Sequence, residues 1–300
     1  MNRRDFLKTA AVAGAGLAAP RLFAEALQAP PPAAGATVWV VQGKDIPAML
    51  AKGMDLAGGW GAFVKKDARV TLKVNAAWAV EPQGGGNTHP DLIKAFCLAA
   101  FAAGAKSVTL PELPCAPAAQ SFSMSGIEGA LKGTGARLYK PEKASEFRTV
   151  AIPKGVDLKE ASVPTDVLDC DCLVNMPVAK SHSGAKLTLS MKNWMGSDKN
   201  RGSWHRKNLH QCIVDYNTVI KPALVIIDAT RIMLTGGPRG PGKMAFPEKL
   251  ILGRDTVACD AVAAGLFGMK PFDIPHIRLA HEAGIGCGDL ALIKVVDVSV

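Results

Sequence analysis

The chain has 300 residues, 48% of them hydrophobic, and its 35 Lys and Arg outnumber its 26 Asp and Glu, which gives a formal net charge of +9. A chain of this length and apolar content can bury a large core, in one large domain or two smaller ones. The basic residues form no Lys/Arg block and are interleaved with apolar residues, so the charge argues against a nucleic-acid-binding protein. A basic pocket for a small anion explains the same excess more economically.

The N-terminus has the features of a twin-arginine export signal. Residues 2–8 read NRRDFLK, and residues 9–19 form an Ala/Gly-rich apolar run. A membrane-spanning helix needs about 20 apolar residues, so this run is too short to anchor the mature protein. We therefore expect a signal peptide and Pro/Ala-rich linker over residues 1–36, followed by a single α/β domain over residues 37–300. The twin-arginine export machinery is an expected partner, and the expected location is periplasmic or otherwise extracytoplasmic. Because this route carries folded proteins, it hints at a cofactor inserted before export.

The first half of the chain predicts a βαβ unit. Residues 37–42 (TVWVVQ) predict a strand, followed by an amphipathic helix over Ile46–Leu56. Residues 69–75 (RVTLKVN) alternate as a second strand, and a triple-glycine loop then leads to a helix that begins near Pro90. The next strand is expected at residues 107–110. This order implies parallel strands joined by a right-handed crossover.

The second half continues the same alternation. Weak signals indicate a helix at 121–132 and two short strands within 137–153. Stronger patterns predict strands at 172–176, 223–228, 250–252 and 290–298, and helices at 207–220, 255–267 and 275–283. The fold class is therefore α/β, with a mostly parallel sheet flanked by helices in Rossmann-like layering. Ligands of such sheets bind beyond the carboxyl ends of the strands, which we assign to four loops: residues 75–89, 177–210, 228–242 and 253–255.

The longest of these loops carries the main candidates for chemistry. His182 and Lys192 lie ten residues apart, just after a strand end. Histidine is the acid/base best matched to neutral pH. A lysine in a partly apolar setting can act as a nucleophile or Schiff-base former, or bind an anion. The same spacing also fits a surface lysine on a short helix capped by His182.

Other candidates are weaker. His205 and His210 are five residues apart, whereas a metal pair on one helix face prefers four; they could converge as metal ligands if a helix begins between them. His89 precedes a helix start and could be structural or catalytic. Residues 236–242 (GGPRGPG) could wrap an anion with backbone amides and Arg239. Asp260 lies in a helix of small residues and needs a partner, which we place in the loop near Asp228 or Gly236.

Cysteine usage excludes some cofactors. The seven cysteines are irregularly spaced and include no C-x-x-C pair, so neither a ferredoxin-type cluster nor a four-cysteine zinc site is encoded. Most are expected to be small core residues, and disulfide pairing stays open.

Several motifs together resemble a bacterial and archaeal family, domain of unknown function 362. They are NTHP (87–90), VNMPVAKSH (174–182), TLSMKNWMG (188–196), the strand end at 227–228, GGP (236–238) and DTVACDAVA (255–263). The resemblance covers about residues 69–296. Some members of that family carry ferredoxin-type motifs, which this chain lacks.

The chain is also similar, more faintly, to the nickel-pincer lactate racemases. That family has an early Thr-His segment, a histidine ten residues before the lysine that holds an organometallic nucleotide, and a later nickel-binding histidine. Thr88-His89, His182 and Lys192 match this layout, with His205 or His210 as the later histidine. The resemblance implies a transition metal, nickel, as cofactor. The segment around Lys192 departs from the pattern, because SMKN replaces the glycine-rich surroundings of the racemases.

These observations lead to one main hypothesis and two alternatives. The main one is an exported enzyme acting on a small anionic substrate, a carboxylate, with His182 and His89 as an acid/base pair. Lys192 would hold a cofactor or the substrate. The substrate-binding residues would be Lys180, Asn193, Thr188, Asn75 and Arg239. One alternative is a periplasmic ligand- or metal-binding accessory protein without catalysis. The other is an electron-transfer partner of an iron–sulfur redox system, which the missing cluster motif disfavours.

Overall fold

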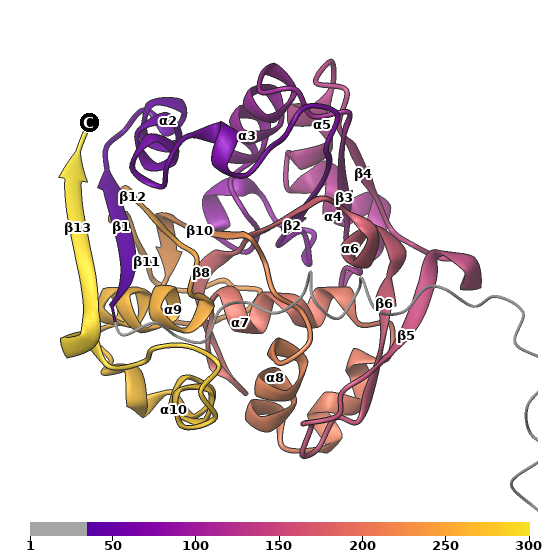
Figure 1. Ribbon diagram of the computed structural model, residues 1–300, viewed down its shortest axis with the longest axis vertical. Coiled ribbons are helices and arrows are strands. Elements are labelled where there is room, and N and C mark those ends of the chain that lie inside the picture. Colours follow the sequence, from indigo (N-terminus) through magenta and orange to yellow (C-terminus); the bar gives the residue numbers. More distant parts are fainter. Residues whose placement is uncertain (1–34) are drawn as a thin grey trace, which may run out of the picture.

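The computed structural model describes residues 35–300 (Figure 1), so the predicted signal and all but the end of its linker lie outside the described residues. A single large sheet runs through this part in the order β13-β1-β12-β10-β7-β2-β3-β4. These strands are β1 Ala36–Gln42, β2 Arg69–Val74, β3 Ser107–Pro111, β4 Arg137–Tyr139, β7 Cys172–Met176, β10 Leu224–Met233, β12 Lys249–Gly253 and β13 Ile293–Ser299. Every pairing in this order is parallel except the two that β12 makes with β1 and β10. The α/β class with a mostly parallel sheet is confirmed.

Helices cover both faces of the sheet (Figure 1). On one face lie α2 Ile46–Leu56, α3 Pro90–Ala102, α4 Ala118–Met124 and α5 Ile127–Leu131; on the other lie α7 Ser190–Asn193, α8 Leu209–Asn217, α9 Thr256–Ala264 and α10 Pro275–Glu282. Each face has its own apolar core, centred on residues such as Phe96 and Trp194 respectively. Because β7 is covered on both faces, all five of its residues are buried, as in other parallel sheets.

A smaller two-stranded sheet lies beside this body. β5 Phe147–Ala151 pairs antiparallel with β6 Glu160–Pro164, and α6 Thr165–Asp169 follows. Buried apolar residues of β6 and α6, such as Val163 and Val167, join the core that contains Trp194.

Residues 177–210 are more ordered than a loop. β8 Val178–His182 pairs with β10 and with β9 Lys186–Thr188, and α7 follows directly. Two short 3-10 helices, Trp194–Ser197 and Arg201–Arg206, complete the segment. α8 begins at Leu209 rather than at residue 207, because the side chain of Asn208 accepts the Gln211 N–H and caps it.

The parallel strands bring their carboxyl ends to one edge of the sheet, and three of the four predicted ligand loops lie there. The fourth prediction, residues 253–255, was wrong. Gly253 ends β12, which runs antiparallel, and it pairs with Val225 near the start of β10. That loop therefore lies at the opposite edge.

No helix within residues 35–300 is long and apolar enough to cross a membrane. All seven cysteines are free, and five of them are buried, as expected for core residues. Cys115 is exposed.

Candidate functional site

A pocket of about 460 Å³ opens at the carboxyl edge of the sheet. Its walls come from the segments after β2 and β3, from β8 and α7, and from the 3-10 helix Arg201–Arg206. Seven of the predicted site residues line it: Asn75, Lys180, His182, Thr188, Lys192, Asn193 and His205. The pocket thus gathers residues that are up to 163 positions apart in the sequence, from Asn75 to Pro238.

Three predicted site residues lie elsewhere. His89 caps α3, where its Nδ1 accepts the Asp91 N–H at 3.1 Å, and it lines a separate hollow of about 360 Å³. The structure therefore does not bring His89 together with His182 in one pocket. Arg239 is exposed, and its neighbour Pro238 lines the pocket instead. His210 stacks on His276, with their Nδ1 atoms 3.0 Å apart.

A buried carboxylate accepts hydrogen bonds from the first residues of α7, the helix that carries Lys192. Asp260 of α9 accepts the backbone N–H groups of Ser190 and Met191, at 2.8 and 3.0 Å, and the Ser190 hydroxyl at 2.5 Å. Burial raises the pKa of Asp260 to about 7, while these hydrogen bonds oppose the shift. The prediction that Asp260 bonds to the loop near Asp228 was wrong, because α9 packs directly against α7.

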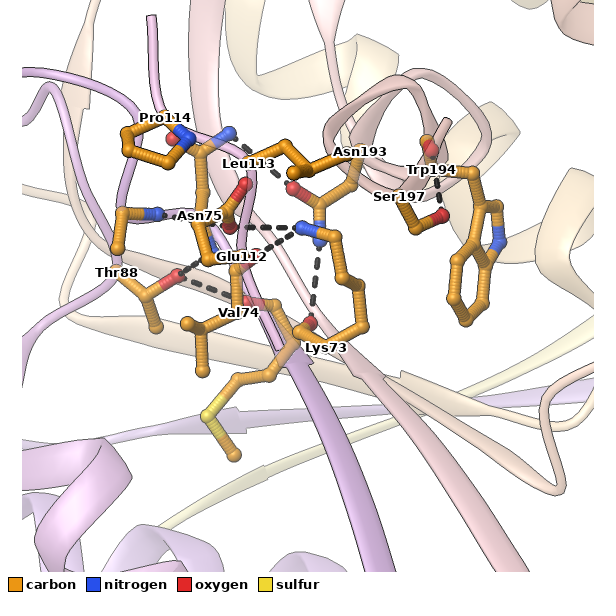
Figure 2. Close-up of polar contacts among 12 residues, drawn as sticks. Lys73, Val74, Asn75, Thr88, Glu112, Leu113, Pro114, Asn193, Trp194 and Ser197 are labelled. Atoms are coloured by element: carbon orange, nitrogen blue, oxygen red, sulfur yellow. Dashed lines mark hydrogen bonds and ion pairs between the residues drawn. The ribbon is translucent and has the colours of Figure 1, made fainter. Parts of the chain in front are cut away.

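A chain of side-chain amides links the pocket residues. Lys180 Nζ donates to Asn75 Oδ1 at 3.2 Å. Asn75 Nδ2 donates to Asn193 Oδ1 at 3.2 Å (Figure 2). Asn193 Nδ2 donates to Asn175 Oδ1 at 2.8 Å, and Asn175 Nδ2 donates to the Ser190 carbonyl at 2.8 Å. Each amide fixes the orientation of the next, so Lys180 and α7 are held in one network.

The two pocket lysines are buried without a carboxylate partner. The only hydrogen-bond acceptor of Lys192 Nζ in the described structure is the Met195 thioether sulfur, at 3.0 Å. Lys180 Nζ donates to Asn75 and to the Gly86 carbonyl. Burial lowers the pKa of Lys192 to about 8 and that of Lys180 to about 7. Burial therefore makes the neutral form of each amine far more accessible near neutral pH than in an exposed lysine.

His182 has a fixed tautomer. Its Nδ1 accepts the backbone N–H groups of Gly184 and Ala185, at 3.0 and 3.1 Å, so the ring proton lies on Nε2. Burial and the nearby charges of Lys192 and Lys180 lower the pKa of His182 to about 3. The ring is therefore a neutral hydrogen-bond donor. A role as general base would require a second proton on Nδ1, where two N–H groups already point.

Residues 70–265, about two thirds of the chain, match the family described as domain of unknown function (DUF362). The chain belongs to the DUF362 family. Residues 1–20 match the twin-arginine translocation signal sequence, which directs this DUF362 protein to export. Both matches confirm what the sequence predicted.

Two known proteins are similar to this DUF362 chain. The "Thylakoid-associated protein sll1697" of Synechocystis sp. is 25% identical over 248 residues, which cover 76% of this chain and 72% of that protein. The lactate racemase apoprotein from Thermoanaerobacterium thermosaccharolyticum aligns with a TM-score of 0.45 and 10% sequence identity. That alignment covers 70% of this chain and 54% of the racemase, so the chain spans about half the racemase's length.

One acid that lines the DUF362 pocket, Glu112, was not among the site residues predicted from the sequence. Its Oε2 accepts from Lys73 Nζ at 2.8 Å and from the Ala76 N–H at 3.2 Å (Figure 2). Gly196 packs so closely that a Cβ there would clash with Glu112 Oε1. Glu112 directly follows β3, so the strand-end rule applied to residues 111–117 could have found it.

The pocket also holds an unsatisfied hydroxyl. Thr188 Oγ1 is buried and has no hydrogen-bond partner among residues 35–300. Buried polar groups are normally satisfied, so a bound molecule that reaches Thr188 would gain a hydrogen bond.

The two predicted metal ligands, His205 and His210, have different surroundings. His205 lines the pocket, whereas His210 is directed to His276. Within the described chain no group of three or more His, Cys, Asp or Glu side chains could hold a metal ion.

Proposed function

We propose that this DUF362 protein is an exported enzyme that binds a small carboxylate in the pocket and moves a proton next to a carbonyl or hydroxyl group. The observation that carries the proposal is Lys192. It is a buried amine that lines the pocket, has no carboxylate partner, and has a pKa lowered by burial to about 8. Buried amines with such pKa values are suited to general-base chemistry near neutral pH.

The other pocket residues suit complementary roles. Lys180 supplies positive charge for the carboxylate, and an incoming anion would stabilise its ammonium form. Lys192 in its neutral form accepts the proton from the substrate carbon and later returns it. His182 donates its Nε2–H to the oxygen on which negative charge develops, and the Thr188 hydroxyl can bind the same molecule. This differs from the acid/base pair expected from the sequence, because His182 acts as a donor and His89 takes no part.

The test is exchange of substrate hydrogen with solvent. A panel of 2-hydroxy and 2-oxo carboxylates is incubated with the protein in D₂O. NMR follows deuterium at C2 of the hydroxy acids and at C3 of the oxo acids, the carbon next to their carbonyl group. We expect exchange with at least one acid, and a loss of about 100-fold or more in Lys192→Met. Lys66→Met, which changes an exposed lysine outside the pocket, is the matched control.

Unchanged exchange in Lys192→Met would contradict the role of this lysine. Stoichiometric binding of a carboxylate with no exchange by the wild-type protein would contradict the enzymatic proposal. In that case the chain would be an exported binding protein.

A further inference from the structure

Three hollows of the surface meet at Gly202. One is the pocket already described, and the second, of about 410 Å³, is lined by residues that include Lys140, Lys199 and Arg201. The third, of about 670 Å³, is lined by residues that include Lys159, Lys199, Arg206 and Lys207. We call the second and third hollows together the basic basin. Gly202 lines all three hollows.

The basin has an excess of positive charge. Six cations line it, namely Lys140, Lys159, Lys199, Arg201, Arg206 and Lys207, against two acids, Glu142 and Glu160. Glu142 is paired with Lys140 at 3.1 Å. Within the described residues, none of the other five cations has a carboxylate at ion-pair distance. The basin therefore attracts anions and has little internal neutralisation.

Several of these cations are held in place by neutral groups. Lys159 Nζ donates to the Gly155 carbonyl and Lys207 Nζ to the Asp157 carbonyl, both at 2.7 Å. The Arg201 guanidinium donates to the carbonyls of Leu113 and Pro114. Carbonyl oxygens orient a cation without cancelling its charge, so these side chains lose less conformational entropy when an anion binds.

Recognition in the basin is ionic rather than aromatic. The only aromatic ring that lines the basin in the described structure is Phe147, and Lys199 Nζ lies 4.8 Å from its centroid. That ring is therefore already engaged by a cation. A ligand here would bind through several anionic groups.

The junction at Gly202 is open. A Cβ on Gly202 would meet no atom within 4 Å, and its backbone is outside the left-handed region. The pocket and the basin can therefore be occupied by one continuous molecule. A bulky side chain at Gly202 would stand in the passage without a clash at its Cβ.

We infer that the basin binds the anionic tail of a molecule whose carboxylate end enters the pocket. The substrate class is then a carboxylate that carries at least two further anionic groups, phosphates or carboxylates, rather than a simple small acid. Entry of the carboxylate end rests on the proposed function, whereas binding of the tail in the basin does not.

The first experiment measures tail binding by isothermal titration calorimetry with tripolyphosphate and with tetraglutamate, compared with inorganic phosphate and acetate. We expect tripolyphosphate to bind about 10-fold or more tightly than inorganic phosphate, or tetraglutamate to exceed acetate by the same factor. The affinity of that polyanion should fall as the salt concentration rises. Arg206→Glu/Lys207→Glu should remove most of that gain. The matched control is Lys65→Glu/Lys66→Glu, which makes the same charge change on exposed lysines, one of which is also bonded to a carbonyl. Tighter binding of tripolyphosphate than of tetraglutamate would indicate a phosphate tail, and the reverse order would indicate a carboxylate tail.

The inference is overturned if neither polyanion binds more tightly than its single anion, or if the two double variants lose the same affinity. Lys192→Met should leave tripolyphosphate binding unchanged, so failure of the proposed catalysis is distinguishable from failure of the basin. Gly202→Tyr tests continuity. This substitution should lower the affinity for tetraglutamate, which can span the junction, about 5-fold or more. It should leave the affinity for tripolyphosphate, which binds in the basin, unchanged. Equal affinities of Gly202→Tyr and wild type for both probes would contradict the link between basin and pocket.

Discussion

Four buried cations lie near the carboxyl edge of this sheet, and they fall into two pairs. Lys73 and Arg231 are 0% and 5% exposed and hold carboxylates, Glu112 at 2.8 Å and Asp228 at 2.6 Å. Lys180 and Lys192 are 1% and 7% exposed and hold none. Burial lowers the pKa of all three lysines, and only at Lys73 does a hydrogen-bonded carboxylate oppose it.

The comparison separates buried cations that have a carboxylate partner from buried cations that have none. The Lys73–Glu112 pair joins β2 to the end of β3, and Arg231 also donates to the carbonyls of Pro82 and Asn87. These cations connect segments that are distant in sequence. Lys180 and Lys192 have no carboxylate at ion-pair distance to offset the cost of desolvation, and they line the pocket. A folded chain tolerates such a cost where a site needs a reactive or anion-binding amine.

Removing the acid of a paired charge should have the largest effect on stability. Glu112→Leu strands the Lys73 ammonium in the core, so the free energy of unfolding should fall by about 3–5 kcal/mol. The measurement is denaturant unfolding. Adding Lys73→Met should recover much of the loss, because the pair is then replaced by apolar groups.

The control for this prediction is the exposed Lys140–Glu142 pair, in which Glu142→Gln should change stability by less than about 1 kcal/mol. Equal losses in Glu112→Leu and Glu142→Gln would mean that burial does not distinguish these ion pairs.

Removing a buried cation that has no carboxylate partner should raise the free energy of unfolding instead of lowering it. Lys192→Met should stabilise the fold by about 1–3 kcal/mol at pH 6, because the variant no longer buries a charge and strands no strong acceptor. The folded pKa of Lys192 is about 8, below its ordinary value of 10.5, so the unfolded state binds more protons between these values. Wild-type stability therefore rises with pH across this window, and the advantage of Lys192→Met should fade.

Thermal or denaturant unfolding at pH 6 and pH 10 measures this change, with Lys66→Met as the exposed control. If Lys192→Met is more stable than wild type by the same amount at both pH values, removal of a buried charge is not the cause of the stabilisation.

Lys180→Met should have the smallest effect. It also removes a buried charge, but it leaves Asn75 Oδ1 and the Gly86 carbonyl without their donor. The two effects oppose each other, so the net change at pH 6 should stay within about 1 kcal/mol. A stabilisation as large as that of Lys192→Met would show that these acceptors find other partners.

Sequence reasoning located most of this site because its rules depend on local pattern. Alternation in residues 69–75 and the apolar run at 172–176 predicted strands that the structure contains. Ligand loops follow the ends of parallel strands, so residues such as Lys180, His182 and Lys192 could be placed together before any contact was known. The export signal and the family motifs are likewise contiguous.

The tertiary structure alone decided strand direction, partners and protonation. Nothing in the composition of β12 shows that it runs antiparallel, so residues 253–255 were assigned to the wrong edge. Asp260 meets Ser190 across 70 positions and Glu112 meets Lys73 across 39, distances that no local periodicity covers. The tautomer of His182 depends on how the turn at Gly184 and Ala185 closes. Charge, burial and hydrogen bonding act through space, and only the folded chain determines which groups are close enough to feel them.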